Sequence, residues 1–594
     1  MPDGLPNKTL IDLLERAGRH PEGGIRFLDR AERDRWVGWT EIRERAQGVC
    51  GGLRDLGIGH GERVALVFPT GLEFFEALFG TLLAGAVPVP LYPPVRLGRL
   101  DEYFRRTARM LEVSGARLVL ADARVRRILG EAVAAACPLL GCRTVDEVRR
   151  TQDLNIGEAV RVDPSDLGLV QFSSGTTVEP KPVALSHRAL VAQVEAINGS
   201  WQDTDGHRES GVSWLPLYHD MGLIGCVFSA LDRDASLTLL GPEQFVARPA
   251  LWLRAISRWK ATISPAPNFA YALCLTRISD AEMEGVDLSS WHTALNGAEA
   301  VSPPVLRAFC ERFARWGFRP EALTPVYGLS EAALAVTFSD PSSPFRSVRV
   351  ERDALAREGL VREAEEGREI VSVGRPLPNF DLEIRDEGGR ALPPDRVGRV
   401  WIQGPSLMDG YLNAPEATAR ALRDGWLDTG DLGFLRGGEL YLTGRAKDVV
   451  ILRGRNHAPE EIERSLEGVP GVRTGCAVAV SWMPELPEGN TEGERLVLLV
   501  EEARNASPQQ LEALPEACRE AVLGAVGLAV DEVVVLEPGT LPRTSSGKLR
   551  RQEALRLWLA GELQPPEPVT PLRMAGAVAR SGLAYARYRW SRNG

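Results

Sequence analysis

The hydrophobic positions of this chain fall into short runs that alternate with longer segments of helical periodicity. The runs include RVALVFP, RLVLAD, LGLVQFS and ATISPAP, and PVLRAFCERFARWGF is a segment of the helical kind. Strands that alternate with helices usually form parallel sheets covered by those helices. The pattern therefore predicts an α/β fold with mostly parallel sheets flanked by helices.

The pattern changes after about residue 400, where short strands and glycine-rich turns follow one another: GRVWIQGP, GELYLTGR and KDVVILRGR. This pattern of short strands and turns predicts a short-stranded β subdomain. A further mixed stretch, from 449 to about 560, predicts a smaller, separate α+β domain. The proline cluster QPPEPVTP then predicts a stiff, extended spacer before the last segment.

Length and charge narrow the class of protein. A chain of 594 residues exceeds what one hydrophobic core usually supports, so two or more domains are expected. With 44% hydrophobic and 25% charged residues, the composition is that of an ordinary globular protein. The net charge of −10 supplies no general positive field, which argues against nucleic acid as the main partner.

The cysteines and the apolar segments indicate where in the cell the protein is expected. The eight cysteines are scattered, with no C-x-x-C pair, and predict reduced thiols in a cytoplasmic protein. The N-terminal stretch carries acidic residues within its apolar part, which is not typical of a signal peptide or a membrane span. The longest apolar region, 64–94, is interrupted by Glu73, Glu76 and several prolines. It predicts a strand, a helix and a strand, so no integral membrane association is expected.

The loop QFSSGTTVEPKP, residues 171–182, is the first candidate for chemistry. It follows an apolar run, so its hydroxyls and amides are expected at the carboxyl end of a strand, where α/β sheets place ligands. Such groups donate hydrogen bonds to phosphate oxygens, and Lys181 adds a positive charge. The loop lacks the Walker A spacing. Taken alone, it is equally compatible with an ordinary surface turn.

Further segments resemble, in the same order, the motifs of the adenylate-forming superfamily of acyl-CoA synthetases, luciferases and nonribosomal adenylation domains. The five matching motifs are the phosphate loop QFSSGTTVEPKPVALSH, the adenine and magnesium motif VYGLSEAALAVT (326–337), the ribose motif WLDTGDLGF (426–434), the hinge GRAKDVVILRGRNHAPEEIE (444–463) and the catalytic-lysine motif LPRTSSGKLRR (541–551). The resemblance covers nearly everything from residue 10 to about 560. It implies a large N-terminal domain over 1–444, a hinge at 445–448, a small mobile domain over 449–560 and a tail over 561–594.

Within that superfamily the chain is most similar to the fatty acyl-AMP ligases. The segments that carry this likeness are AGAVPVPLYPP, SWLPLYHDMGLIG, SPAPNFAYALC, NGAEAVSP and GRNHAPEEIE, together with a long connection over 338–372. In that family an insertion in the large domain is thought to restrain the small domain and to disfavour transfer to CoA. The resemblance implies activation of a fatty acid with ATP and Mg²⁺, followed by acyl transfer to a phosphopantetheinylated acyl carrier protein.

The resemblance also assigns roles to individual residues. Lys548 is expected to bridge the attacking carboxylate and the α-phosphate, Glu331 to ligate Mg²⁺, and His219, with Asp220, to lie near the carboxylate end of the acyl tunnel. The expected phosphate-loop residues are Ser173, Ser174, Gly175, Thr176, Thr177 and Lys181. The expected nucleotide-binding residues are Asn296, Gly297, Ala298, Glu299, Tyr327, Gly328, Asp431 and Arg445, with Tyr327 stacked on adenine and Asp431 and Arg445 on ribose. Lys447 is the expected hinge residue.

Each of these residues also has an ordinary structural explanation. Lys548 could be a solvated surface lysine and Glu331 a charge at a helix N-terminus. Asp431 could form an Asx turn, Arg445 could belong to a plain Gly-Arg turn, and Tyr327 and His219 could be core residues. Only the ordered motifs favour the functional roles over these alternatives.

The chain departs from the family pattern in the phosphate loop. Val178 and Pro182 stand where the family usually carries glycine, and both changes stiffen the loop. Three hypotheses therefore remain: a fatty acyl-AMP ligase that uses a carrier protein, an acyl-CoA synthetase, and a relative that binds nucleotide or acyl groups without turnover. The 338–372 connection and the YHDMG and APNFAY segments favour the first.

The last segment follows its own pattern. Arg573, Arg580 and Arg587 recur every seven residues, so a helix over about 572–590 would carry them as one slowly drifting stripe. Such a basic helix, with Tyr588, Arg589 and Trp590 near its end, could dock an acidic carrier protein or an anionic membrane surface. We expect instead a solvated helix or a frayed tail.

Overall fold

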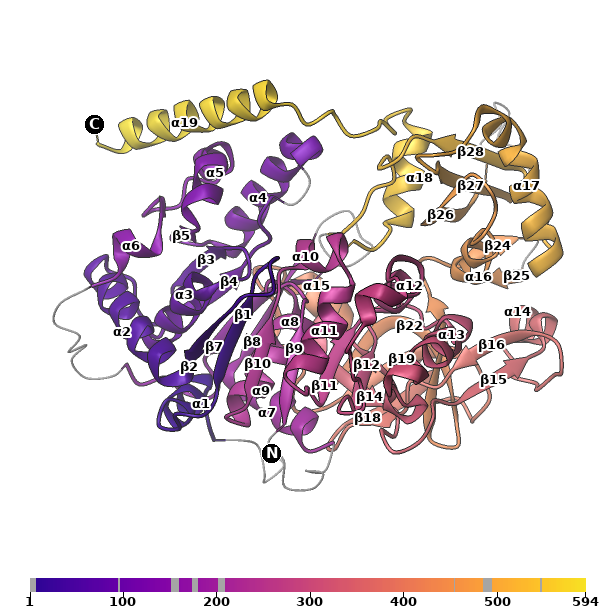
Figure 1. The fold of residues 1–594 in the computed structure, drawn as a ribbon, viewed down its shortest axis with the longest axis horizontal. Helices are drawn as coiled ribbons and strands as arrows, with labels where there is room; N and C mark the ends of the chain where they lie inside the picture. Colours follow the sequence, from indigo (N-terminus) through magenta and orange to yellow (C-terminus); the bar gives the residue numbers. More distant parts are fainter. Residues whose placement is uncertain are drawn as a thin grey trace.

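The computed structural model of the protein describes residues 7–94, 97–150, 160–173, 180–200, 209–452, 455–483, 494–544 and 547–593. Sheets of mostly parallel strands lie among helices, and a short-stranded β sheet and a small C-terminal α+β region follow them along the chain (Figure 1). The α/β fold class expected from the sequence is confirmed.

One sheet has a parallel centre and antiparallel edges. Its strands run in the order β17 (Arg375–Pro376), β14 (Ala335–Phe338), β13 (Leu323–Gly328), β12 (Thr293–Asn296), β11 (Ile263–Ala266), β9 (Ser210–Ser213), β10 (Ser236–Leu239), β1 (Gly24–Leu28), β2 (Asp34–Gly38). The pairings from β13 to β1 are parallel, and those of β2, β14 and β17 are antiparallel. Helices in the connections include α7 (His187–Asn198), α11 (Ala250–Arg258), α12 (Asn268–Arg277) and α13 (Pro303–Phe313).

A second sheet is parallel throughout. Its order is β4 (Val87–Pro90), β3 (Arg63–Val67), β5 (Leu118–Ala121), β6 (Cys142–Arg143). The helices around it are α2 (Trp39–Asp55), α3 (Leu72–Leu83), α4 (Leu100–Ser114) and α5 (Ala123–Ala136). The apolar region 64–94 is thus the strand, helix and strand that its interrupted pattern predicts.

The candidate phosphate loop belongs to an antiparallel sheet, in the order β20 (Gly410–Tyr411), β8 (Lys181–Ser186), β7 (Leu167–Ser173). The loop leaves the carboxyl end of β7, as expected, but it returns in the neighbouring antiparallel strand rather than through a parallel crossover. Pro182 pairs with Phe172 within this ladder, and its carbonyl accepts a hydrogen bond from the Leu412 amide at 2.8 Å.

The short-stranded sheet follows the parallel sheets along the chain. It has the order β18 (Asp381–Arg385), β19 (Gly398–Gln403), β22 (Trp426–Arg436), β21 (Leu422–Arg423), with β23 (Glu439–Arg445) also paired to β22. The long 338–372 connection forms β15 (Ser347–Val350), α14 (Arg352–Glu358) and β16 (Arg368–Val371). β15 and β16 pair in antiparallel fashion.

The C-terminal region contains hydrophobic clusters of its own, formed by residues between Val450 and Leu563. Its elements are β24 (Val450–Leu452), β25 (Arg455–His457), α16 (Pro459–Arg464), β26 (Val472–Trp482), β27 (Arg495–Glu502), α17 (Pro508–Val526), β28 (Glu532–Leu536) and α18 (Arg551–Leu559). These clusters begin at Val450, just after the expected hinge. The domain boundaries given from the sequence remain a prediction.

The tail forms helix α19 (Pro571–Asn593), which crosses back from the C-terminal region and lies along α5 (Figure 1). Tyr585 and Tyr588 join the hydrophobic cluster of the parallel β3–β5 sheet. The expectation of a solvated helix or frayed tail is therefore wrong, because one face of α19 is packed against the large part of the chain. No helix in the described part of the chain is long and apolar enough to cross a membrane.

Arg551 holds a cluster of carboxylates together at the start of α18. Its guanidinium makes two 2.7 Å contacts with the Glu463 carboxylate and also lies 3.0 Å from Glu460 and 3.4 Å from Asp448. The Arg551 side chain is 12% exposed and that of Asp448 is fully buried. This cluster joins Asp448, at the end of the expected hinge, to the helices α16 and α18.

We expect Arg551→Ala to lower the free energy of unfolding of the C-terminal region by about 3–5 kcal/mol, because it leaves buried carboxylates without their cation. Urea titration with limited proteolysis as the readout measures this. The matched control is Arg556→Ala in the same helix, whose side chain is 50% exposed and pairs with Glu553 and Glu562. The control should change stability much less, because Arg556 and its partners are screened by solvent. Equal effects of the two substitutions would contradict a special role for Arg551.

Candidate active site

Lys548 lies on the segment between β28 and α18. The Lys548 amide donates to the Thr544 hydroxyl at 3.0 Å, and its carbonyl accepts from the Thr544 amide at 2.8 Å. Gly547 has a φ of 93°, in the left-handed region that favours glycine, and its carbonyl accepts from Arg543 at 2.8 Å. These contacts of Thr544 and Gly547 hold the backbone of Lys548 in place.

The Lys548 ammonium faces charged residues of the large part of the chain. Burial and the Arg445 guanidinium lower its pKa, while the carboxylates of Asp220, Glu299 and Asp431 act in the opposite direction. These residues lie far apart in the sequence and come from separate elements. The structure thus places Lys548, whose side chain is partly buried, near three carboxylates and one guanidinium of other elements.

The expected ribose residues form one hydrogen-bonded unit where the end of β23 pairs with β22. The Tyr327 hydroxyl donates to Asp431 Oδ2 at 2.7 Å, and Arg445 Nε lies 3.0 Å from Asp431 Oδ1. Asp431 is 5% exposed and Tyr327 is 7% exposed. Because each carboxylate oxygen has two lone pairs, Asp431 keeps one acceptor position on each oxygen for a ribose hydroxyl.

The NGAEA segment follows β12 beside β13. Gly297 has no room for a side chain, since an added Cβ would lie 2.7 Å from Val326 Cγ2, and at Gly328 it would lie 1.8 Å from the Leu334 carbonyl oxygen. Ala298 is exposed with a φ of 68°. Asn296 is fully buried, and neither atom of its amide has a hydrogen-bond partner among the described residues. A buried amide in that state is suited to a ligand that completes its hydrogen bonds.

Glu299 turns toward the first turn of α12. Its Oε1 accepts a hydrogen bond from the Phe269 amide at 2.5 Å, and burial raises the pKa of its carboxyl. Because Glu299 also acts electrostatically on Lys548, it connects the adenine-side segment to the lysine. The structure therefore places Glu299 with the other charged residues that act on Lys548.

Tyr411 connects the two residues expected to handle phosphate and metal. Its hydroxyl donates to Glu331 Oε1 at 2.8 Å, and the Lys181 ammonium lies 4.5 Å from the centre of its ring. The backbone of the same segment adds a bond from the Met408 amide to the Glu331 carbonyl at 2.8 Å. Sequence reasoning missed Tyr411, and the only available signal was a tyrosine within the turn-rich stretch MDGYLNAP.

His219 and Asp220 lie beside this group. Burial lowers the pKa of His219 to about 4, and Lys548 contributes in the same direction. His219 is therefore neutral at neutral pH, which makes it a polar lining residue rather than a positive charge. Asp220 Oδ2 accepts a hydrogen bond from the Ser330 hydroxyl at 2.5 Å, so the residue before Glu331 is tied to the YHDMG segment.

The remaining predicted residues lie at the edges of the site. Ser173 is buried and pairs with Lys181 at the open end of the β7–β8 ladder. Lys447 is exposed but close enough to influence the pKa of Lys181, which is lowered mainly by burial. The predicted loop residues Ser174, Gly175, Thr176 and Thr177, and the departure at Val178, lie outside the described residues.

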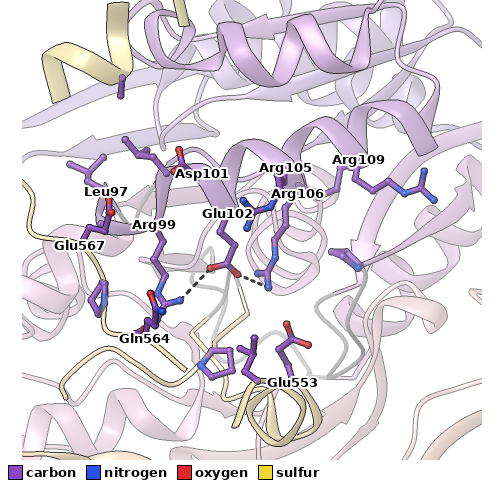
Figure 2. A pocket seen from close by; sticks show the side chains of 18 of the residues that line it. Leu97, Arg99, Asp101, Glu102, Arg105, Arg106, Arg109, Glu553, Gln564 and Glu567 are labelled. Carbon is purple, nitrogen blue, oxygen red and sulfur yellow. Dashed lines mark hydrogen bonds and ion pairs between the residues drawn. The ribbon is translucent and has the colours of Figure 1, made fainter. Parts of the chain in front are cut away.

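A cleft of about 1640 Å³ opens beside the candidate phosphate loop. Its walls come from α4, from α18 and from the segment that leads to α19, and Lys181 lies at its inner edge. Figure 2 shows Glu102 of α4 between Arg99 and Arg106, with nitrogen–oxygen distances of 3.6 and 2.7 Å. Of the predicted site residues, Lys181 is the one that lines this cleft in the described part of the chain.

A magnesium ion fits this donor set only as part of a complex with phosphate. In the described residues, no group of three or more His, Cys, Asp or Glu side chains is placed to hold a metal by itself. Mg²⁺ is commonly bound through one or two carboxylates with substrate phosphates and water as its other ligands. Glu331 would supply the carboxylate, and the ion would supply neutralisation of phosphate charge.

The comparison with protein families decides what kind of site this is. Residues 13–412, which contain all the predicted site residues before the ribose motif, match the model of the AMP-binding enzyme family. The chain belongs to the AMP-binding enzyme family. It is therefore an adenylate-forming ligase.

Relatives in the family differ in the acceptor that their names give. A provisionally named acyl-CoA synthetase of Caulobacter vibrioides is 34% identical, over 93% of this chain and 96% of its own. The medium-chain-fatty-acid–[acyl-carrier-protein] ligase JamA of Moorena producens is 32% identical, with the same shares covered. A structure from a study of fatty acyl-adenylate ligases of E. coli and L. pneumophila has a TM-score of 0.86 and 32% identity, over 95% of this chain and 99% of that one.

We expect Tyr411→Phe to reduce the rate of adenylate formation about tenfold, because Glu331 loses the hydroxyl that fixes it and the ring under Lys181 is kept. ATP–pyrophosphate exchange measures the rate, and a Mg²⁺ titration should show a raised requirement for the ion. Tyr103→Phe is the control, since its hydroxyl contacts the Tyr92 carbonyl at 3.2 Å instead of Glu331. A Tyr411→Phe enzyme with an unchanged Mg²⁺ dependence would contradict this role.

The pH dependence should report Lys548. Because burial lowers its pKa, kcat/KM for adenylate formation should fall at a pH below the value of about 10.4 at which an ordinary lysine loses its proton. Lys548→Arg should move this alkaline limb upward, since arginine stays charged, even though its maximal rate will be lower. The idea fails if both enzymes show the same alkaline limb.

Proposed function

We propose that this protein activates a medium- or long-chain fatty acid with ATP and Mg²⁺ to a fatty acyl adenylate. It then passes the acyl group to the phosphopantetheine thiol of an acyl carrier protein. The observation that carries the first step is the convergence of Lys548, from the C-terminal region, with Arg445, Asp431 and Glu331 of the large part. The fatty acid and the carrier protein are taken from the names of the relatives.

The first step must bring a carboxylate to the α-phosphate of ATP although both are anions. A carboxylate oxygen forms a bond to the α-phosphorus, and the bond from phosphorus to the pyrophosphate oxygen breaks. Lys548 would lie between the two anions and stabilise the charge that develops there. No general base is needed, because a fatty acid is already ionised at neutral pH.

Other residues would position the substrates for this step. Asp431 and Arg445, tied to each other and to Tyr327, would hold the ribose, and the unpartnered Asn296 amide would complete its hydrogen bonds on the bound adenylate. Lys181 would hold phosphate beside Glu331. His219, neutral because of burial, would line the site near the carboxylate without repelling Lys548.

In the second step a thiolate attacks the acyl carbonyl, a thioester forms, and AMP leaves with the electron pair of its bond to the carbonyl carbon. Two ion pairs between α14 and the C-terminal region support a carrier protein as the acceptor. Arg352 lies 2.7 Å from Glu461, and Asp353 lies 3.3 Å from Arg455. The 338–372 connection thus contacts the C-terminal region, which is where a segment that disfavours transfer to CoA would need to act.

Two alternatives follow from specific observations. The name of the Caulobacter relative favours a fatty acyl-CoA synthetase, which shares the first step and ends on CoA. A binding protein without turnover is suggested by Val178 and Pro182. Pro182, however, sits in a regular ladder where its carbonyl is hydrogen-bonded, so this substitution is compatible with an intact strand at the loop.

Product analysis tests the proposal directly. Purified protein, Mg²⁺-ATP and a panel of fatty acids are incubated alone, with CoA and with a phosphopantetheinylated carrier protein, and the products are identified by mass spectrometry. We expect acyl-AMP that persists with CoA and is consumed by the carrier protein. Lys548→Ala should lower adenylate formation by about 10²- to 10³-fold, because it removes one preorganised donor.

The alternatives give different products. Conversion of the adenylate to acyl-CoA would assign the protein to the synthetases, and the carrier protein would then show no advantage. An absence of adenylate from every acid, with wild type and Lys548→Ala alike, would leave a binding protein. In that case calorimetric titration with ATP would still detect the nucleotide site.

A further inference from the structure

Helix α19 has one face buried against the large part of the chain. Ala577, Ser581 and Tyr588 are 2%, 1% and 7% exposed. The Ser581 hydroxyl accepts a hydrogen bond from the Gly130 amide at 2.6 Å, and Tyr588 donates to the Pro138 carbonyl. Gly130 is needed for this approach, because an added Cβ would lie 2.1 Å from the Ser581 carbonyl oxygen. These contacts fix how the helix is rotated about its axis.

The opposite face of α19 carries large apolar side chains that none of the described elements covers. Leu572, Leu583 and Trp590 are 84%, 62% and 83% exposed. At about 100° per residue the three positions lie within about 20° of one line along the helix, and at 1.5 Å per residue the line is about 27 Å long. This exposed stripe is straight, convex and tipped by a tryptophan.

The charges around the stripe are positive. Residues 571–593 contain five arginines and no acidic residue, in a chain whose net charge is −10. Arg573 pairs with Glu567, and Arg580 with Glu131 and Asp101, on the flank toward the enzyme. Arg587 and Arg589, beside the tryptophan, are exposed and make no ion pair with any described residue. A partner that fits both the apolar stripe and the arginines beside it would have to be apolar and anionic.

We propose that the exposed face of α19 is a docking surface for an anionic lipid bilayer. Interfacial helices use this combination: leucine and tryptophan enter the boundary of the acyl chains, and arginines on the flanks meet lipid phosphates. A flat bilayer contacts both ends of a 27 Å stripe at once. A small acidic protein could cover the same convex stripe only with a groove that runs along its whole length.

The docking surface has a defined relation to the cleft. Leu572 and Arg573, at the first turn of α19, also line the cleft that leads toward Lys181. Because α19 is fixed to α5 by its buried face, a bilayer held at the stripe would lie near that opening. Docking itself does not depend on the proposed function, since it uses none of the residues of the candidate active site.

Vesicle flotation of the full-length protein tests the proposal. Vesicles of phosphatidylcholine mixed with phosphatidylglycerol are compared with vesicles of phosphatidylcholine alone. We expect binding to the anionic vesicles that weakens with added salt. The double variant Leu583→Ser with Trp590→Ser should bind at least about tenfold more weakly, and Arg587→Gln with Arg589→Gln should lose about tenfold on anionic vesicles only.

The matched control changes two apolar residues of similar exposure elsewhere, Val246→Ser with Leu523→Ser, which are 54% and 57% exposed. This control should bind like the wild type. Pyrophosphate release from a short-chain acid in the absence of vesicles should be the same for all variants, which separates loss of docking from loss of activity. Thermal unfolding of the Leu583–Trp590 variant should match the wild type, since both side chains are exposed.

Three results would overturn the proposal. One is binding by the wild type that does not distinguish anionic from neutral vesicles. Another is undiminished binding by the Leu583–Trp590 variant. The third is a concentration-dependent dimer, seen by light scattering and abolished in that variant, with no vesicle binding; this would show that the stripe covers a second copy of the chain.

Discussion

The candidate site depends on one positive charge, that of Lys548. The C-terminal region contributes this charge, and the rest of the chain contributes the groups around it. Lys548 reaches into a group formed by Asp220, Glu299, Asp431 and Arg445, and its lowered pKa reflects the desolvation that this position imposes. A buried cation is tolerated where carboxylates face it and costs stability where they do not. In the proposed reaction, this arrangement leaves the positive charge of Lys548 where the two anionic substrates would meet.

The tail adds a second connection between the same two parts. Beyond α18 the chain passes Arg99, which donates to the carbonyls of Thr540 and Gln564, and the Glu567 amide bonds to the Gly98 carbonyl at 3.1 Å. The chain then docks as α19 on α5. The C-terminal region is thus attached to the large part at both of its ends, and the cleft beside Lys181 has walls from both parts and from the connecting segment.

Much of the fold followed from local pattern, because apolar runs and helical periodicity are read within a few residues of one another. The strands at 63–67, 118–121 and 167–173 and the helix at 303–313 lie where the pattern placed them. Two features of the tertiary arrangement were not predicted from the sequence. The phosphate loop joins antiparallel strands, and α19 is docked, because its buried face uses small and hydroxyl-bearing residues such as Ala577 and Ser581 that do not form an obvious apolar stripe.

The sequence by itself determined the order of the motifs, the family, and the residue types available for binding nucleotide and phosphate. Only the tertiary structure decided which of them meet. Tyr327 and Asp431 are 104 positions apart, Tyr411 and Glu331 are 80 apart, and Gly130 and Ser581 are 451 apart. Each contact forms because the packing of the sheets and of α19 brings together residues that are far apart in the sequence. No local periodicity around either residue indicates such a contact.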